Sequence, residues 1–119
     1  MEGNGSEKRK FPRLMVEANV EYQILDEKKR KRKLAKDISS GGICIIVFEN
    51  LPVDTELSLK IFLSDINYVM EVKGRVAWKS EYSLSSEGTV RYQLGIEFVD
   101  ISDLDRKRLD NYIFTLLRK

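Results

Sequence analysis

The chain has 119 residues and a mass of 13.8 kDa, which fits a single domain with its own hydrophobic core. It contains one cysteine and no histidine. An internal disulfide is therefore excluded, the commonest zinc ligand is missing, and neither Ser-His-Asp nor Cys-His nucleophilic catalysis is possible. We predict that the protein is not an enzyme and has no catalytic residues, no metal site and no cofactor.

The charge is unevenly distributed, although the net charge is only +2. Between Glu7 and Lys36 the chain carries eleven basic and five acidic residues, whereas the remainder carries ten basic and fourteen acidic residues. A basic first third indicates an anionic partner. Because no apolar stretch is long enough to span a membrane and the N-terminus lacks a signal peptide, we expect a cytoplasmic protein without membrane insertion.

Alternating apolar and polar residues predict a series of short β-strands. The first covers residues 16–24 and is followed by a charged connection at 26–33. A second strand at 34–38 ends in a Ser-Ser-Gly-Gly turn. The continuous apolar run at 43–48 then predicts a strand that is covered on both faces.

The second half of the chain continues this pattern. Strands are predicted at 57–63, 70–78 and 90–98, and the alternation places Trp78 on the core side of its strand. The polar stretch at 80–88 indicates a flexible loop before the last strand.

A helix is predicted over residues 102–118. Ser102 with Asp105 three residues later resembles a capping box. Apolar residues then recur at helical spacing along one stripe, formed by Leu109, Tyr112, Ile113, Leu116 and Leu117. We expect this stripe to cover one opening or face of the sheet, with a partner-binding helix as the alternative. The elements together predict a mainly β fold, a six-stranded antiparallel β-barrel with one C-terminal α-helix.

Arg9 and Arg13 form the first candidate site. Pro12 keeps this segment extended, so the two guanidinium groups can hold two ends of one anion. The planar arginine fork pairs with phosphate oxygens and matches the O6 and N7 acceptors of guanine. A solvated basic face is the alternative.

The second candidate site lies on residues 37–42. Asp37 and Ser39 are two residues apart, so at a strand end they project to one side while Ile38 points to the core. A carboxylate accepts from the N–H donors of guanine, and a hydroxyl donates or accepts beside it. Gly41 and Gly42 permit a tight turn and the close approach of a ligand. An ordinary turn between strands is the alternative.

Taken together, these motifs resemble a known family. Arg-x-x-x-Arg at 9–13, followed by Asp-x-Ser-x-x-Gly at 37–42, is similar to the PilZ domain family, whose members bind the bacterial second messenger cyclic di-GMP. Gly-Arg-Val-Ala-Trp at 74–78 and Leu-Gly-Ile-Glu-Phe at 94–98 resemble two further strands of that family. The resemblance extends from about Lys8 to the C-terminal helix.

The resemblance implies a bacterial cyclic di-GMP receptor made of one PilZ-like domain at 8–119, after a flexible tail at 1–7. The domain would consist of an arm at 8–14, a barrel at 15–100 and the C-terminal helix. The residues implied to bind the ligand are Arg9, Arg13, Asp37, Ser39 and Gly42, with Lys8, Lys10 and Gly41 as further candidates.

The resemblance also implies how the signal leaves the protein. We expect no attached output domain, so the signal would pass by contact to an unidentified downstream protein, with motility, surface polysaccharide production or pilus function as the outputs that the resemblance implies. We expect the ligand to fold the arm onto the barrel, so that residues 5–14 lose fast motion on binding.

Two other functions stay open. The fold could serve as a protein-interaction module without a physiological nucleotide ligand, although the intact candidate residues argue against this. A nucleic-acid-binding barrel would use the basic run at 28–33, which lacks the interleaved aromatic residues of single-strand readers. We expect this run to be a solvated hairpin loop, with ligand steering or docking on an acidic partner or membrane surface as alternatives. Cys44 is expected to be a buried thiol.

Overall fold

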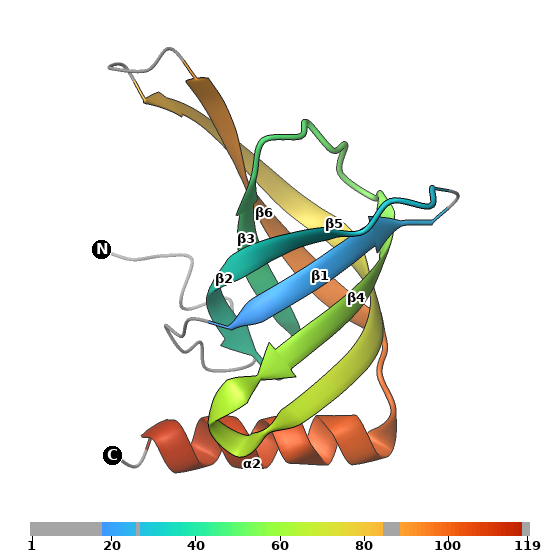
Figure 1. The fold of residues 1–119 in the computed structure, drawn as a ribbon, viewed down its shortest axis with the longest axis vertical. Helices are drawn as coiled ribbons and strands as arrows, with labels where there is room; N and C mark the ends of the chain where they lie inside the picture. The colour runs from blue at the N-terminus through green and yellow to red at the C-terminus, as the bar shows by residue number, and fades with distance from the viewer. Residues whose placement is uncertain (1–17, 26, 85–88, 118–119) are drawn as a thin grey trace.

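The computed structural model describes residues 18–25, 27–84 and 89–117, whose strands close into a barrel that carries one long helix (Figure 1). The elements in chain order are β1 (Asn19–Ile24), β2 (Lys31–Ser39), β3 (Gly42–Val47), β4 (Glu56–Leu63), the short 3₁₀ helix η1 (Ser64–Ile66), β5 (Tyr68–Leu84), β6 (Thr89–Asp100) and α2 (Asp103–Leu117). Around the barrel the strands follow the order β1-β2-β3-β6-β5-β4, and all neighbours are antiparallel. The predicted six-stranded barrel with a C-terminal helix is therefore confirmed.

The interior of the barrel is filled by alternate residues of the strands. In β4, Leu57, Leu59, Ile61 and Leu63 are at most 1% exposed, and the residues between them face the outside. Full burial of such a side chain stabilises the fold by roughly 1.5–3 kcal/mol relative to leaving it exposed. The period of two in the sequence is confirmed here because this strand runs without interruption through the wall of the barrel.

Helix α2 lies across one end of the barrel (Figure 1). Its first turn is capped by the Ser102 hydroxyl, which accepts a hydrogen bond from the Asp105 N–H at 3.1 Å, as the sequence predicts. Leu109 and Ile113 are buried against the barrel. Leu117, predicted as part of the buried stripe, is instead 49% exposed because it is the last helical residue and α2 extends there past the β4–β5 turn.

Two predicted loops are too long. Strand β2 begins at Lys31, inside the charged connection predicted at 26–33, and Lys31 pairs with Tyr22 of β1. Strands β5 and β6 remain paired as far as Leu84 and Thr89, so most of the loop predicted at 80–88 is a hairpin. This hairpin projects beyond the barrel (Figure 1). Outside the barrel its strands need no apolar face. Their sequence is therefore polar and resembles that of a loop.

The alternation predicts Trp78 on the core side of its strand, but Trp78 lies on the outer side of the barrel. A β-bulge between Val76 and Trp78 shifts the pairing with β6, so that Trp78 is opposite Gly95 and only half-buried. The indole covers Gly95 so closely that a Cβ atom there would lie 2.0 Å from its Nε1 atom. Within the described part of the chain, no helix is long and apolar enough to cross a membrane.

Candidate functional site

The candidate segment 37–42 forms the end of β2, a tight turn and the start of β3. Ser39 pairs with Gly42 across the hairpin, which leaves Ser40 and Gly41 as the two residues at the tip. The turn that the composition predicts is therefore present, and it is of the shortest kind that joins antiparallel strands.

Hydrogen bonds from two other elements, β6 and α2, hold this turn in place. The Phe98 N–H of β6 donates to the Gly41 carbonyl oxygen at 2.9 Å. The Arg106 Nη1 atom of α2 donates to the Ser40 carbonyl oxygen at 3.2 Å. The position of the candidate segment is thus set jointly by a strand and by the helix. Arg106 belongs to no motif in the sequence, so only the structure identifies it.

A β-bulge decides which side chains of β2 face outward. Ala35 and Ile38 both point into the core, at 4% and 0% exposure, although they are three residues apart. The register shift between Ala35 and Asp37 absorbs the extra residue, Lys36. Asp37 and Ser39 consequently share the outer side of the strand, as their spacing predicts, although both side chains are buried there.

The hydroxyl of Ser39 is only weakly engaged within the turn. Its Oγ atom donates to the Gly42 carbonyl oxygen at 3.4 Å and accepts from the Gly41 N–H at 3.3 Å. Both distances are long for hydrogen bonds of a hydroxyl group. The hydroxyl can therefore turn toward a ligand at little cost in hydrogen-bond energy.

Gly42 is required by the sheet itself. A Cβ atom at this position would lie 2.3 Å from the carbonyl oxygen of Ile96 in β6, far inside contact distance. The close approach that the sequence suggests at Gly42 is thus made by the neighbouring strand. This packing reason is independent of any ligand.

Polar and aromatic side chains of β5 and β6 border the segment on the outer wall. Glu97 is opposite Gly42, and its Oε1 atom accepts from Arg75 Nη2 at 2.8 Å. This hydrogen bond raises the pKa of Arg75 above its usual value. One step further along the sheet, Trp78 covers Gly95.

The sequence presents the motifs at 74–78 and 94–98 as separate signals, whereas the structure pairs them. Arg75 lies opposite Glu97, and Trp78 lies opposite Gly95. Cys44 is also opposite Gly95, across the β3–β6 pairing, and is 1% exposed, so the predicted buried thiol is confirmed.

The structure brings some of the predicted site residues together and leaves others undescribed. Asp37, Ser39, Gly41 and Gly42 meet at the β2–β3 turn. The predicted residues of the N-terminal arm, namely Lys8, Arg9, Lys10 and Arg13, lie outside the described residues. Among the residues that the structure describes, no cluster of three or more His, Cys, Asp or Glu side chains could hold a metal ion.

Comparison with known proteins gives a family. The model of the family described as "PilZ domain" matches residues 7–115. Among solved structures, the PilZ domain of YcgR from Escherichia coli with c-di-GMP superposes with a TM-score of 0.72 at 16% identity, covering 93% of this chain and 92% of that one. A comparison with curated protein sequences gives no match.

Two larger proteins share the fold. The Bacillus subtilis inhibitor of motility, MotI/DgrA, has a TM-score of 0.73 and 22% identity, over 94% of this chain and 53% of that chain. The K. pneumonia MrkH–c-di-GMP complex has a TM-score of 0.76 and 18% identity, over 92% and 52%. The chain thus spans about half the length of these two proteins. At such identities the likeness shows a common fold.

Proposed function

Because the chain belongs to the PilZ domain family, we propose that it is a cytoplasmic receptor for cyclic di-GMP without catalytic activity. Two solved structures with the same fold, those of YcgR and MrkH, are complexes with c-di-GMP, which supports this ligand. The observation that carries the proposal is the joint placement of Asp37 and Ser39 on the outer side of β2, next to a turn fixed by Arg106.

In this proposal the β2–β3 turn holds a guanine base. The Asp37 carboxylate accepts hydrogen bonds from guanine N–H groups, and the Ser39 hydroxyl turns from its long contacts within the turn to the base. Gly41 and Gly42 keep this surface free of side chains. A base held here lies on the same outer wall as the half-buried indole of Trp78.

The arginine arm supplies the remaining contacts in the proposal. Arg9 and Arg13 bind the phosphates and the Hoogsteen edge of guanine, with Lys8 and Lys10 as further cations. We propose a tail at 1–7, an arm at 8–14 that becomes ordered on the ligand, a barrel at 15–100 and the helix. The ordered arm would then form the surface that a downstream protein reads.

Isothermal titration calorimetry with cyclic di-GMP tests this function. The wild-type protein should give saturable heat with cyclic di-GMP and none with GTP. Asp37→Asn and Arg13→Ala should each weaken binding by at least tenfold, because a charge-assisted hydrogen bond contributes about 1.5–3 kcal/mol. Asp100→Asn serves as the matched control for Asp37→Asn, since Asp100 is an exposed carboxylate on a different strand, β6.

The controls separate a failed site from a failed fold. Each variant should keep the thermal unfolding midpoint of the wild type to within a few degrees, and Asp100→Asn should keep its affinity. A folded wild-type protein that gives no heat with cyclic di-GMP would refute the receptor proposal. The same result would favour a protein-interaction module without a nucleotide ligand.

A further inference from the structure

The end of the barrel opposite α2 carries the β1–β2 and β3–β4 connections, and the β5–β6 hairpin extends beyond this end to one side (Figure 1). These connections are joined to each other. The Leu25 N–H donates to the Glu56 carbonyl oxygen at 3.2 Å, and Glu49 accepts hydrogen bonds from Tyr22 at 2.8 Å and from Lys31 at 2.5 Å. We call the surface formed by residues 25, 27–33 and 48–55 the loop end. Because its two connections are held together, it is a preformed surface.

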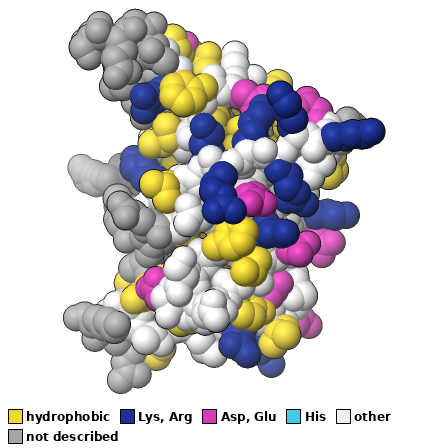
Figure 2. Space-filling view, in the orientation of Figure 1, with side chains coloured by type: hydrophobic (Ala, Val, Ile, Leu, Met, Phe, Trp, Pro, Cys, Tyr) yellow, Lys and Arg dark blue, Asp and Glu magenta, His cyan; other side chains and the backbone are white. Residues whose placement is uncertain are grey.

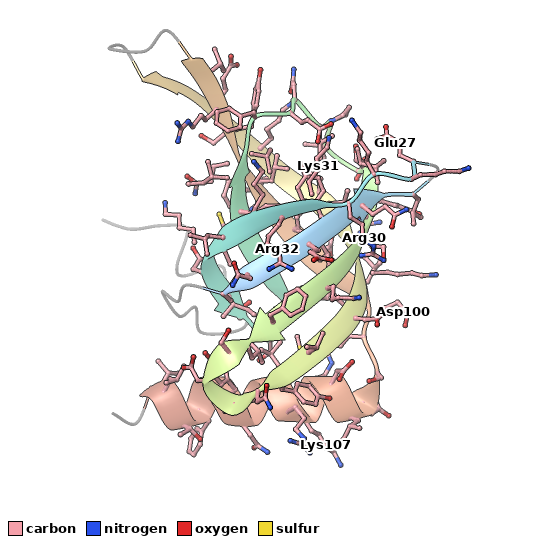
Figure 3. All side chains as sticks on the ribbon, viewed as in Figure 1. Glu27, Arg30, Lys31, Arg32, Asp100 and Lys107 are labelled. Carbon is pink, nitrogen blue, oxygen red and sulfur yellow. The ribbon has the colours of Figure 1, made fainter. Side chains whose placement is uncertain are left out.

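The loop end carries an excess of available positive charge. Lys28, Lys29 and Arg30 are exposed and take part in none of the ion pairs among the described residues. The exposed acids Glu27 and Asp54 offset part of this charge. In the view of Figure 2, Lys and Arg side chains gather over the upper half of the molecule. Figure 3 shows Arg30 beside Lys31 and Arg32, far from Lys107 on α2.

Exposed apolar side chains also belong to the loop end. Phe48 is 54% exposed, Val53 is 47% exposed and Leu25 is 36% exposed. The Lys33 Nζ atom and the Arg91 guanidinium each lie 4.9 Å from the centre of the Phe48 ring. The loop end thus presents an aromatic side chain flanked by cations, together with aliphatic side chains on the same pair of connections.

This combination distinguishes between polyanions. A single-stranded nucleic acid needs open aromatic faces for base stacking, whereas cations already lie against the ring of Phe48. Exposed aliphatic residues such as Val53 and Leu25 contribute nothing to phosphate binding. An anionic bilayer surface uses both features, because apolar side chains enter the head-group region while Lys and Arg side chains meet lipid phosphates.

We propose that the loop end docks peripherally on a membrane surface rich in anionic phospholipid. Phe48, Val53 and Leu25 enter the head-group region, and Lys28, Lys29 and Arg30 bind lipid phosphates. In this orientation the β2–β3 turn, which Arg106 ties to α2 at the other end of the barrel, takes no part in the membrane contact. The proposal does not depend on cyclic di-GMP, and the protein lies on the membrane without spanning it.

Vesicle co-sedimentation of the full chain tests this proposal. We expect binding to phosphatidylcholine vesicles that contain about 30% phosphatidylglycerol, and at least tenfold weaker binding to pure phosphatidylcholine. Lys28→Gln/Lys29→Gln should weaken binding about 25-fold, at roughly fivefold for each cation removed near the surface. Lys73→Gln/Lys107→Gln, the matched control, removes two exposed cations outside the loop end and should change binding by less than about threefold.

A second variant tests the apolar contact separately. Phe48→Ala should weaken vesicle binding severalfold, and the loss should persist when salt screens the charges. Equal binding to both kinds of vesicle, or equal losses in the two double variants, would overturn the proposal. Tighter binding of a labelled oligothymidine than of the anionic vesicles would also overturn it, in favour of a nucleic acid. Unchanged thermal midpoints in all variants exclude unfolding as the cause.

Discussion

Gly42→Ala tests how closely β3 and β6 pack at the candidate site, because the size of the expected clash follows from the structure. The new Cβ atom would lie 2.3 Å from the Ile96 carbonyl oxygen, whereas real Cβ contacts essentially never fall below 3.0 Å. Strands β3 and β6 must therefore separate locally by at least ~0.7 Å. Overpacking of this kind costs about 1–3 kcal/mol in the free energy of unfolding.

The corresponding fall in the thermal midpoint is roughly 4–12 °C for a domain of this size. Differential scanning calorimetry measures it, with Ala77→Ser as the control that adds one atom to an exposed residue of β5. The displaced turn should also weaken cyclic di-GMP binding at a temperature at which the variant is still folded. A Gly42→Ala protein with the wild-type midpoint would refute the claim that the sheet requires this glycine.

Two further variants test the contacts around the turn and at the loop end. Arg106→Ala removes the hydrogen bond to Ser40 and should lower the free energy of unfolding by about 0.5–1.5 kcal/mol while weakening cyclic di-GMP binding. Burial alone would raise the pKa of Glu49, but hydrogen bonds from Lys31 and Tyr22 outweigh it and hold this pKa below the ordinary 4.5. Since the pKa is lower in the folded state, wild-type stability falls as the pH drops below about 4.5, and Glu49→Gln should flatten this fall.

Each of these variants has its own control. Lys107→Ala changes the residue next to Arg106 on an exposed part of α2 and should leave stability and affinity unchanged. If it reduces affinity as much as Arg106→Ala does, the contact with Ser40 is not the cause. For Glu49→Gln, chemical denaturation at several pH values is the measurement. If the free energy of unfolding of Glu49→Gln falls at acid pH as steeply as that of the wild type, Glu49 does not contribute to this fall.

Several parts of the fold can be predicted from the sequence because local patterns carry them. The alternation of Leu57 to Leu63 predicts an uninterrupted strand, and Ser102 marks the start of the helix. The β-bulge in β2 and the one between Val76 and Trp78 in β5 leave no such pattern, since one extra residue changes the facing of every later side chain. For this reason the alternation alone places Trp78 on the wrong side of β5.

In the candidate site, too, local sequence patterns predict some features and long-range contacts determine the others. Asp37 and Ser39 belong to a local motif on one strand, and their shared side follows from a spacing of two. Arg106 donates to Ser40 of the turn although the two residues are 66 positions apart in the sequence. No local sequence pattern predicts such a contact. Long-range pairing likewise brings Glu97 opposite Gly42, which only the closed order of the strands determines.

An NMR titration of the ¹⁵N-labelled chain with cyclic di-GMP tests directly whether the ligand binds at the β2–β3 turn. If the ligand binds at the β2–β3 turn, the amide signals of residues 37–44 and the indole signal of Trp78, the only tryptophan, should shift together and saturate. Amides of residues 5–14 should lose fast motion at the same ligand concentration. Shifts confined to the loop end, with residues 37–44 unchanged, would contradict the proposed site.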